Sequence, residues 1–335
     1  MPPTDSAPAT ADTRDASDAA SPTVCVLAPT PQLSIEIEPG RVSPDAPELH
    51  VHHGGQGLWV ARMAHSLGAE VVVCGPFGGE TGTVAAFLAE SDGLRVRRTL
   101  GTAGAGGYVH DRRDGEREEV ATAVPHPLDR HEVDDLYGTV LVEGLEADVV
   151  VLTGADPATT IPADLVGRLA ADLRAAGRPV VADLSGDAAR AFAAAGGSVL
   201  KMSHEELVEA GIATGEGAAA LLKGARSLLG NGLEAVVVSR ADEPALVVTA
   251  SDVLTASGPE LSVVDHRGAG DSMTAGLAVG LARGLDLEGA VRLGVAAGAL
   301  NVTRHGLGTG RREHVERVAE EVSLEPHRAA ARTSR

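Results

Sequence analysis

The stretch from Asp265 to Asp271 combines residue types that could transfer a phosphoryl group. The small-residue turn Gly268-Ala269-Gly270 separates the two carboxylates, and more small residues follow Asp271. Glycines let a backbone approach a ligand closely, and the free N–H groups where a helix begins attract anions. Asp271 beside such an anion site could take a proton from an attacking hydroxyl group. The alternative is an ordinary loop in which the aspartate caps a helix.

The composition limits the partners and the compartment. Acidic residues outnumber basic residues, 47 to 28, so the 335-residue chain has a net charge of −19, which disfavours nucleic acids and acidic membrane surfaces as partners. Cys25 and Cys74 lie in apolar runs, where buried free thiols are expected. No run approaches the ~20 apolar residues of a membrane span, and the first residues do not resemble a signal peptide. We therefore expect a cytoplasmic protein.

Strand-like and helix-like segments alternate regularly from residue 148 onward. Short apolar runs at 148–152 and 179–184 are separated by an amphipathic run at 162–175, and similar pairs follow. This alternation predicts a parallel sheet that is covered by helices on both faces, which is an α/β fold.

Other parts of the chain have a different character. Two patches in which polar and apolar residues alternate, at 33–53 and 95–122, predict exposed strands of a second, smaller sheet. Residues 1–22 are rich in Pro, Ala, Thr, Ser and Asp without periodicity, so we expect a disordered tail. We expect one domain over 23–322 and a second tail over 323–335.

Three motifs resemble, in their order and spacing, the signatures of the ribokinase-like (PfkB) carbohydrate kinases. Residues 265–276 resemble the C-terminal signature, Gly54-Gly55-Gln56-Gly57 the N-terminal glycine signature, and 200–207 a short acidic motif. The similarity is greatest to the 1-phosphofructokinase type of hexose kinase. The resemblance implies a three-layer α/β/α fold with a mainly parallel central sheet and a small β lid over the sugar.

The resemblance also implies an activity. It predicts an ATP-dependent kinase that phosphorylates an alcohol group of a sugar or sugar phosphate, with Asp271 as the catalytic base. The backbone N–H groups of Ala269, Gly270 and Asp271 would hold the transferring group, and Gly268 belongs to the same catalytic turn. Lid strands often pair between subunits in relatives, which predicts a homodimer through the lid.

The resemblance assigns cofactor ligands to several separate segments. These are Ser239, Asn301, Gly306, Gly308 and Arg267 for ATP, Glu206 for Mg²⁺ through a water, and Asp265 for K⁺. Simpler roles remain open for three of them. Ser203 and Glu206 have the spacing of a helix capping box, Asn301 could merely end a helix, and Arg267 could be a solvated loop residue.

Two of these segments depart from the family pattern. The family usually has Asn at the position of Ser203, which weakens the prediction of magnesium handling. Relatives are rich in glycine near Ser239, whereas this chain has Ala241 and Pro244 at two such positions. The contact geometry at the nucleotide is therefore expected to differ.

The predicted acceptor side consists of Gly54, Gly55, Gln56, Trp59 and Ser34, and it departs further from the family. The family has Lys at the position of Gln56, Asn at that of Trp59 and Asp at that of Ser34. The Thr-Arg pair that relatives use on the sugar phosphate has no counterpart at 102–107. A bidentate arginine is a strong phosphate contact, so its loss predicts a rebuilt pocket and makes a sugar phosphate less expected. Trp59 could stack on a ring or fill the pocket.

Three other functions compete with a hexose kinase. One is a nucleoside or other non-hexose kinase of the same family, and another is a catalytically degenerate regulator that binds nucleotide or sugar. A dinucleotide-binding dehydrogenase is disfavoured, because no Gly-x-Gly-x-x-Gly follows the first strand. His50, His52 and His53 suggest a metal site, but no carboxylate or cysteine lies at useful spacing, so we interpret them as part of a polar lid strand.

Overall fold

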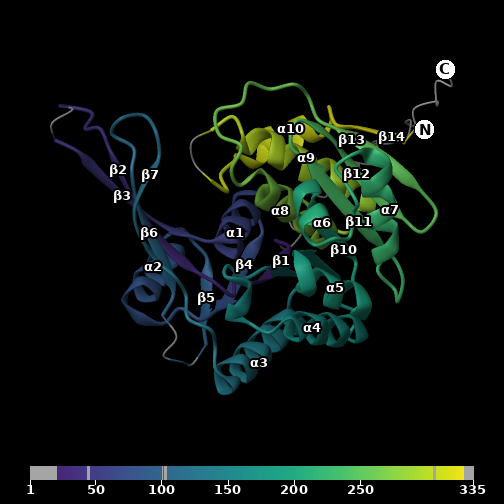
Figure 1. Cartoon of the computed structure of the whole chain (residues 1–335), viewed down its shortest axis with the longest axis horizontal. Helices are drawn as coiled ribbons and strands as arrows, with labels where there is room; N and C mark the ends of the chain where they lie inside the picture. Colours follow the sequence, from purple (N-terminus) through teal and green to yellow (C-terminus); the bar gives the residue numbers. More distant parts are fainter. Residues whose placement is uncertain (1–20, 44–45, 100, 102–103, 305–306, 328–335) are drawn as a thin grey trace, which may run out of the picture.

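The computed structural model describes residues 21–43, 46–99, 101, 104–304 and 307–327. The predicted N-terminal tail therefore lies outside the described residues, except for Ser21 and Pro22. Within the described ranges, a large sheet and a small sheet are present (Figure 1). No helix in these ranges combines the length and apolar character needed to cross a membrane.

The large sheet has the strand order β14-β13-β12-β11-β10-β9-β8-β1-β4-β5. Its parallel strands are β1 (Thr23–Leu27), β4 (Glu70–Gly75), β5 (Arg95–Arg98), β8 (Val149–Thr153), β9 (Val180–Asp183), β10 (Val199–Ser203) and β11 (Ala235–Arg240). Antiparallel strands β12 (Glu243–Thr249), β13 (Val253–Ser257) and β14 (Ser323–Pro326) complete it. The central strands β1 and β8 are continuous apolar runs because both faces of the sheet are covered.

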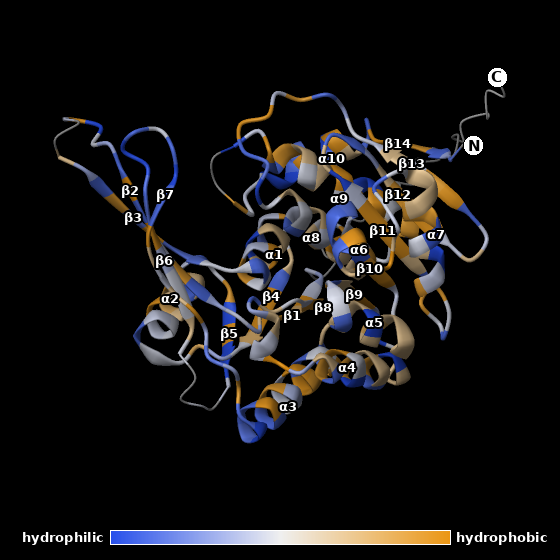
Figure 2. Cartoon of the chain, in the orientation of Figure 1, coloured by the Kyte–Doolittle hydropathy of each residue, from blue (hydrophilic) through white to orange (hydrophobic). Residues whose placement is uncertain are grey.

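Helices cover both faces of this sheet and make two hydrophobic cores. One core includes α1 (Gln56–Ser66), α2 (Gly79–Ser91), α8 (Ala269–Ala282), α9 (Leu287–Asn301) and α10 (Arg312–Ala319). The other includes α3 (Arg130–Glu146), α4 (Ala163–Ala175), α5 (Gly186–Ala195), α6 (His204–Glu209) and α7 (Ala218–Leu228). Figure 2 shows the hydrophobic strands between these helices. The predicted α/β fold with three layers is confirmed.

Helix α3 was not predicted from the sequence. It begins with a capping box between Asp129 and Glu132, and it packs on the sheet through Val133, Leu136 and Val140. Glycines, threonine and valines interrupt its helical pattern, and residues of these types have low helix propensity. Packing against the sheet therefore stabilises a helix that its own sequence signals only weakly.

The small sheet, which we call the lid, has the order β3-β2-β6-β7 and projects from the main body (Figure 1). Its strands are β2 (Gln32–Glu38), β3 (Glu48–Gly54), β6 (Gly106–Asp111) and β7 (Glu118–Ala123). The prediction of a second sheet is confirmed, but residues 95–98 do not belong to it. They form β5, which pairs with β4 at the edge of the large sheet. An edge strand and a lid strand have the same alternating pattern, so the sequence could not separate them.

The chain does not end in a tail at residue 323. Residues 323–326 form β14, which pairs with β13 in an antiparallel register that joins Ser257 to Ser323 and Leu254 to Pro326. The predicted tail is therefore wrong for these four residues, and 328–335 lie outside the described residues. A four-residue edge strand with one large apolar residue, Leu324, is too short to show an alternating pattern.

Candidate active site

The candidate site lies at the carboxyl ends of the parallel strands, where ligands bind in open α/β sheets. Strand β9 ends at Asp183, and the sheet register places Lys201 of β10 beside it. In the same way Ser203, the last residue of β10, pairs with Ser239 near the end of β11. The sheet thus gathers polar side chains from segments that are distant in the sequence.

A buried ion pair forms the floor of the site. The Lys201 ammonium lies 3.1 and 3.2 Å from the two carboxylate oxygens of Asp183, and the Thr274 hydroxyl donates to the same carboxylate at 2.7 Å. All three side chains are buried. Sequence reasoning missed Asp183 and Thr274 and assigned no role to Lys201. The available signal was a lysine within an apolar strand, since a buried charge needs a partner.

Helix α8 begins directly over this ion pair. Gly268 precedes the helix with φ of 71°, a left-handed conformation that favours glycine. A Cβ atom on Gly270 would lie 2.6 Å from the Lys201 ammonium nitrogen, so a larger residue there would displace the lysine from its present position. The structure therefore brings the predicted residues Gly268, Ala269, Gly270 and Asp271 beside the Asp183–Lys201 pair.

Asp271 lies in a cluster of charges that shifts its protonation equilibrium. Burial and the neighbouring carboxylates of Asp183 and Glu206 raise the pKa of Asp271 to about 7, although the Lys201 ammonium acts in the opposite direction. Burial by itself would lower the pKa of Lys201, but the surrounding carboxylates raise it, so the lysine stays charged. A general base works best when its pKa lies near the working pH.

Glu206 is held by the predicted capping box, which is confirmed. Its backbone N–H donates to the Ser203 hydroxyl at 3.1 Å, and its carboxylate accepts from the Ser203 backbone N–H at 2.6 Å. Burial raises the pKa of this carboxyl group. Among the described residues, no group of three or more His, Cys, Asp or Glu side chains has metal-binding geometry, and this includes the three lid histidines. A Mg²⁺ ion at this place would be held mainly by phosphates and waters, and the free oxygen of the Glu206 carboxylate fits the predicted contact with one of those waters.

Asp265 and Arg267 form a fork within the loop before α8. The backbone N–H and the Nε of Arg267 both donate to one oxygen of Asp265 at 3.0 Å, and a terminal guanidinium nitrogen donates to the other oxygen. These hydrogen bonds hold the pKa of Asp265 below its usual value. Both carboxylate oxygens are thus already bonded to the guanidinium, and the role of Asp265 as a K⁺ ligand stays a prediction.

Asn301 and Gly308 fasten this loop to the rest of the domain. The buried Asn301 amide donates to the Arg267 carbonyl at 2.7 Å and accepts from the Gly308 N–H at 3.0 Å. Gly308 has φ of 61° and lies against the Trp59 backbone, where a Cβ atom would be 2.5 Å from the carbonyl oxygen. The structure thus shows a structural role for both residues, and Gly306 lies outside the described residues.

The predicted nucleotide segment follows β11. Ser239 is partly exposed near the end of that strand. Ala241 has φ of 37°, a region that L-residues other than glycine rarely adopt. The backbone therefore keeps the conformation of the glycine that the family pattern predicts, although the side chain has changed.

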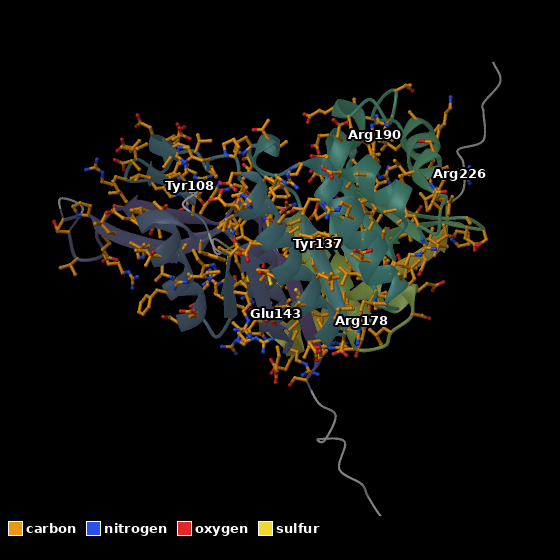
Figure 3. All side chains as sticks on the ribbon, turned by 90° about the horizontal axis from the view of Figure 1, so that it is seen from below. Tyr108, Tyr137, Glu143, Arg178, Arg190 and Arg226 are labelled. Carbon is orange, nitrogen blue, oxygen red and sulfur yellow. The ribbon has the colours of Figure 1, made fainter. Side chains whose placement is uncertain are left out.

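The predicted acceptor residues lie where α1 meets the lid. Gly55 has φ of 94° and precedes α1, and the Gln56 side chain accepts from the Gly154 backbone N–H at 2.9 Å. Trp59 is partly exposed on α1. Ser34 is buried in the lid, where it lies opposite Tyr108 in the sheet register. Figure 3 shows Tyr108 on the lid, apart from the α3 face that carries Tyr137 and Glu143.

An arginine cluster that the sequence did not reveal lies between the lid and the loop before α8. Arg112 contacts Glu36 at 3.4 Å and Asp265 at 4.0 Å. The Arg117 guanidinium lies 5.2 Å from the centre of the Tyr108 ring, and burial together with the positive charge of Arg267 lowers its pKa. In the described part of the chain, Arg117 has no carboxylate at ion-pair distance. We call Arg112, Arg117 and Arg267 the arginine cluster.

Comparison with known proteins identifies relatives over most of the chain. The family model described as pfkB family carbohydrate kinase matches residues 27–314. The ATP-dependent 6-phosphofructokinase isozyme 2 of Mycobacterium tuberculosis is 30% identical over 92% of both chains. The 1-phosphofructokinase of Bacillus subtilis is 35% identical over 53% of this chain and 58% of its own length.

A solved structure shows the same fold. Phosphofructokinase-2 from Escherichia coli in complex with potassium has a TM-score of 0.73 and 22% identity, and the match covers 90% of this chain and 98% of that one. Together with the family match, this places the glycine signature, the acidic motif and the α8 turn in one shared architecture. The chain belongs to the pfkB family of carbohydrate kinases, and is by that membership a phosphotransferase that acts on a sugar alcohol.

Proposed function

We propose that this kinase transfers the γ-phosphoryl group of ATP to an alcohol group of a sugar or sugar phosphate, with Asp271 as the catalytic base. The observation that carries the proposal is the position of Asp271 in the first turn of α8, within the electrostatic influence of Lys201, with a pKa raised to about 7. A carboxylate with this pKa is available to accept a proton from a hydroxyl group near neutral pH.

The first turn of α8 supplies the anion site that the transfer needs. The Ser272 N–H is the first to bond within the helix, to the Gly268 carbonyl, so the N–H groups of Ala269, Gly270 and Asp271 remain free for a ligand. These groups and the helix dipole favour a phosphoryl group as its charge develops. The acceptor hydroxyl would attack phosphorus as its proton moves to Asp271, and the bond from the γ-phosphorus to the bridging oxygen of ATP would break.

ATP and Mg²⁺ are the cofactors that we infer. The name of the M. tuberculosis relative supports ATP, and the position of Ser239 at the same sheet edge supports a nucleotide there. When bound, Mg²⁺ neutralises phosphate charge. Glu206 would orient one of its waters, because one oxygen of that carboxylate remains outside the capping box.

The arginine cluster supports an acceptor that carries an anionic group. The sequence made a sugar phosphate less expected, because the family's Thr-Arg pair is missing. In the structure, Arg117 projects over Tyr108 on the same lid face as Ser34, and Arg112 and Arg267 lie nearby. Arginine binds phosphate through strong charge-assisted hydrogen bonds. Names of relatives such as 1-phosphofructokinase agree with this class of substrate.

We also infer a homodimer and a cytoplasmic location. Ile35, Val51 and Val109 lie side by side in the lid register, and Leu49 and Val51 are exposed, so a second lid could cover an apolar surface. Light scattering of the full chain measures the oligomeric state.

The free, buried thiols of Cys25 and Cys74 support a reducing compartment.

The test is ADP release with magnesium and ATP against fructose 1-phosphate, fructose 6-phosphate, fructose and adenosine. We expect turnover with a sugar phosphate, and we expect Asp271→Asn to lower kcat by about 10²–10⁴-fold while ATP binding persists. Turnover that is unchanged in Asp271→Asn would refute the role of this base. ATP binding without turnover on any acceptor would favour the degenerate regulator.

A further inference from the structure

The loop before α8 meets the end of α9 at a junction that contains several oxygen atoms. A potassium site at Asp265 is implied by the family resemblance, and the E. coli neighbour was solved with potassium. A bound K⁺ needs oxygen ligands with free lone pairs. Whether a cation fits therefore depends on how many lone pairs of these oxygens are not already used by hydrogen bonds.

N–H groups already bond to each of the four oxygen-bearing groups that we identify at this junction. They are the Asp265 carboxylate, bonded by Arg267; the Val302 carbonyl, bonded by the N–H groups of Val264 and Asp265 at 2.7 and 3.1 Å; the Asn301 side-chain oxygen, bonded by Gly308; and the Arg267 carbonyl, bonded by Asn301. A carbonyl oxygen has two lone pairs, so the Val302 carbonyl is saturated. Both oxygens of the Asp265 carboxylate already accept from Arg267, so a cation would have to share them with the guanidinium.

The charges around the junction also oppose a cation. Arg112 lies 4.0 Å from the same carboxylate, and the positive charge of Arg267 contributes to the lowered pKa of Arg117. The arginine cluster thus places three guanidinium groups around Asp265 and Glu36. A monovalent cation would enter a region where positive side chains already outnumber the carboxylates, and such a region repels it.

We propose that the Arg267 guanidinium is a built-in cation that takes the place of a monovalent ion, so that this kinase needs no K⁺. Arg267 is a positioning residue. Its side chain neutralises Asp265, its carbonyl is held by Asn301, and the next residue is the left-handed Gly268 that precedes α8. The fork thereby orders the turn that presents the anion site. This inference rests on the proposed function, because the anion site is where the phosphoryl group would bind.

Arg113 offers a matched control within the same chain. Its backbone N–H and Nε both donate to Asp111 at 3.0 Å, which repeats the geometry of the Arg267 fork. This second fork lies in the exposed turn between β6 and β7, and no described contact joins it to α8. Replacing Arg113 removes an equivalent fork away from the anion site.

The experiment compares thermal unfolding and ADP release in KCl and in choline chloride at one ionic strength, for the wild type, Arg267→Ala and Arg113→Ala. The wild type and Arg113→Ala should respond equally to both salts. Arg267→Ala should lose about tenfold in activity in choline, recover most of it in KCl, and show a rise in Tm with KCl. Arg267→Lys retains the charge and should stay indifferent to potassium.

Two results would overturn the inference. One is a wild type whose Tm or activity rises in KCl relative to choline chloride, which would mean that a potassium site exists despite the fork. The other is an Arg267→Ala variant that does not respond to KCl in Tm. Because the Tm comparison requires no turnover, it decides the inference even if no acceptor is phosphorylated. If Arg267→Ala does not fold, the wild type and Arg267→Lys still give the first of these results.

Discussion

The floor of the site and the lid hold their charges in different ways. At the floor, Asp183, Lys201 and Thr274 are buried and bonded to one another. In the lid, Arg112 and Arg117 are partly or fully exposed, and Arg112 shares its partner Asp265 with Arg267. Buried charges are costly when they lose a partner, whereas exposed ion pairs contribute little to stability.

This difference explains where the chain departs from the family pattern. Around Asp271, a change of one charged residue would leave another charged residue buried and unpaired. These residues can therefore change only together. On the acceptor side, Gln56, Trp59 and Ser34 have replaced the family residues, and the arginine cluster supplies new charge at the surface. The phosphoryl-transfer end is thus physically constrained, and the acceptor side, where α1 meets the lid, is free to change.

Removing the lysine from the floor should have the largest effect. We expect Lys201→Met to lower the free energy of unfolding by about 3–5 kcal/mol, because Asp183 would stay buried without its cation. Urea unfolding followed by circular dichroism measures this. In the lid, Arg112→Met should cost less than about 1 kcal/mol, because its ion pair is partly solvated. Equal losses for the two variants would contradict the distinction between floor and lid.

The protonation of Asp271, which lies above the floor in the first turn of α8, should control the rate. Asp271 must be ionised to act as a base, and its pKa is raised to about 7, so kcat/KM should fall about tenfold for each pH unit below that value. The measurement is a pH profile with a saturating sugar-phosphate cosubstrate and varied ATP. The acidic limb should reflect Asp271, because burial and the carboxylates of Asp183 and Glu206 raise its pKa. A rate that is flat from about pH 5 to pH 8 would be inconsistent with this role.

Changing one lid arginine should affect binding and leave the floor intact. We expect Arg117→Gln to weaken the binding of fructose 1-phosphate about tenfold, through the loss of a charge-assisted contact, with no change in Tm. Titration calorimetry of the full chain measures this. Arg113→Gln is the matched control, since Arg113 is paired with Asp111 and should have no such effect. If the two variants bind the ligand equally well, the arginine cluster is not the anion site.

The smallest effect is expected at the nucleotide segment. Ala241→Gly should stabilise the protein by a few tenths to about 1 kcal/mol, because alanine at φ of 37° is strained and glycine is not. Urea unfolding measures the gain, and Ala250→Gly, in the turn after β12 where no positive φ is present, serves as the comparison. A destabilised Ala241→Gly variant would mean that the native turn is not strained.

Local signals in the sequence were sufficient for much of this protein. Alternating strand and helix patterns predicted the α/β fold, the glycines around Ala269 predicted the turn that begins α8, and the spacing of Ser203 and Glu206 predicted the capping box. Each of these features depends on residues within a few positions of one another, where periodicity, backbone freedom and capping act directly. Strand β14 and helix α3 escaped prediction, and β5 was assigned to the wrong sheet, because tertiary pairing and packing decide these elements.

Only the tertiary structure decided which charges meet. Asp183 lies 18 residues from Lys201 and 91 from Thr274, and Arg112 of the lid reaches Asp265 of the α8 loop. Such partners depend on strand order and on where the lid sits, and neither leaves a periodic trace in the sequence. Electrostatic energy depends on the distances between charges and on their burial in the folded chain. The raised pKa of Asp271 and the hydrogen bonds from Arg267 to Asp265 therefore became visible only in the tertiary structure.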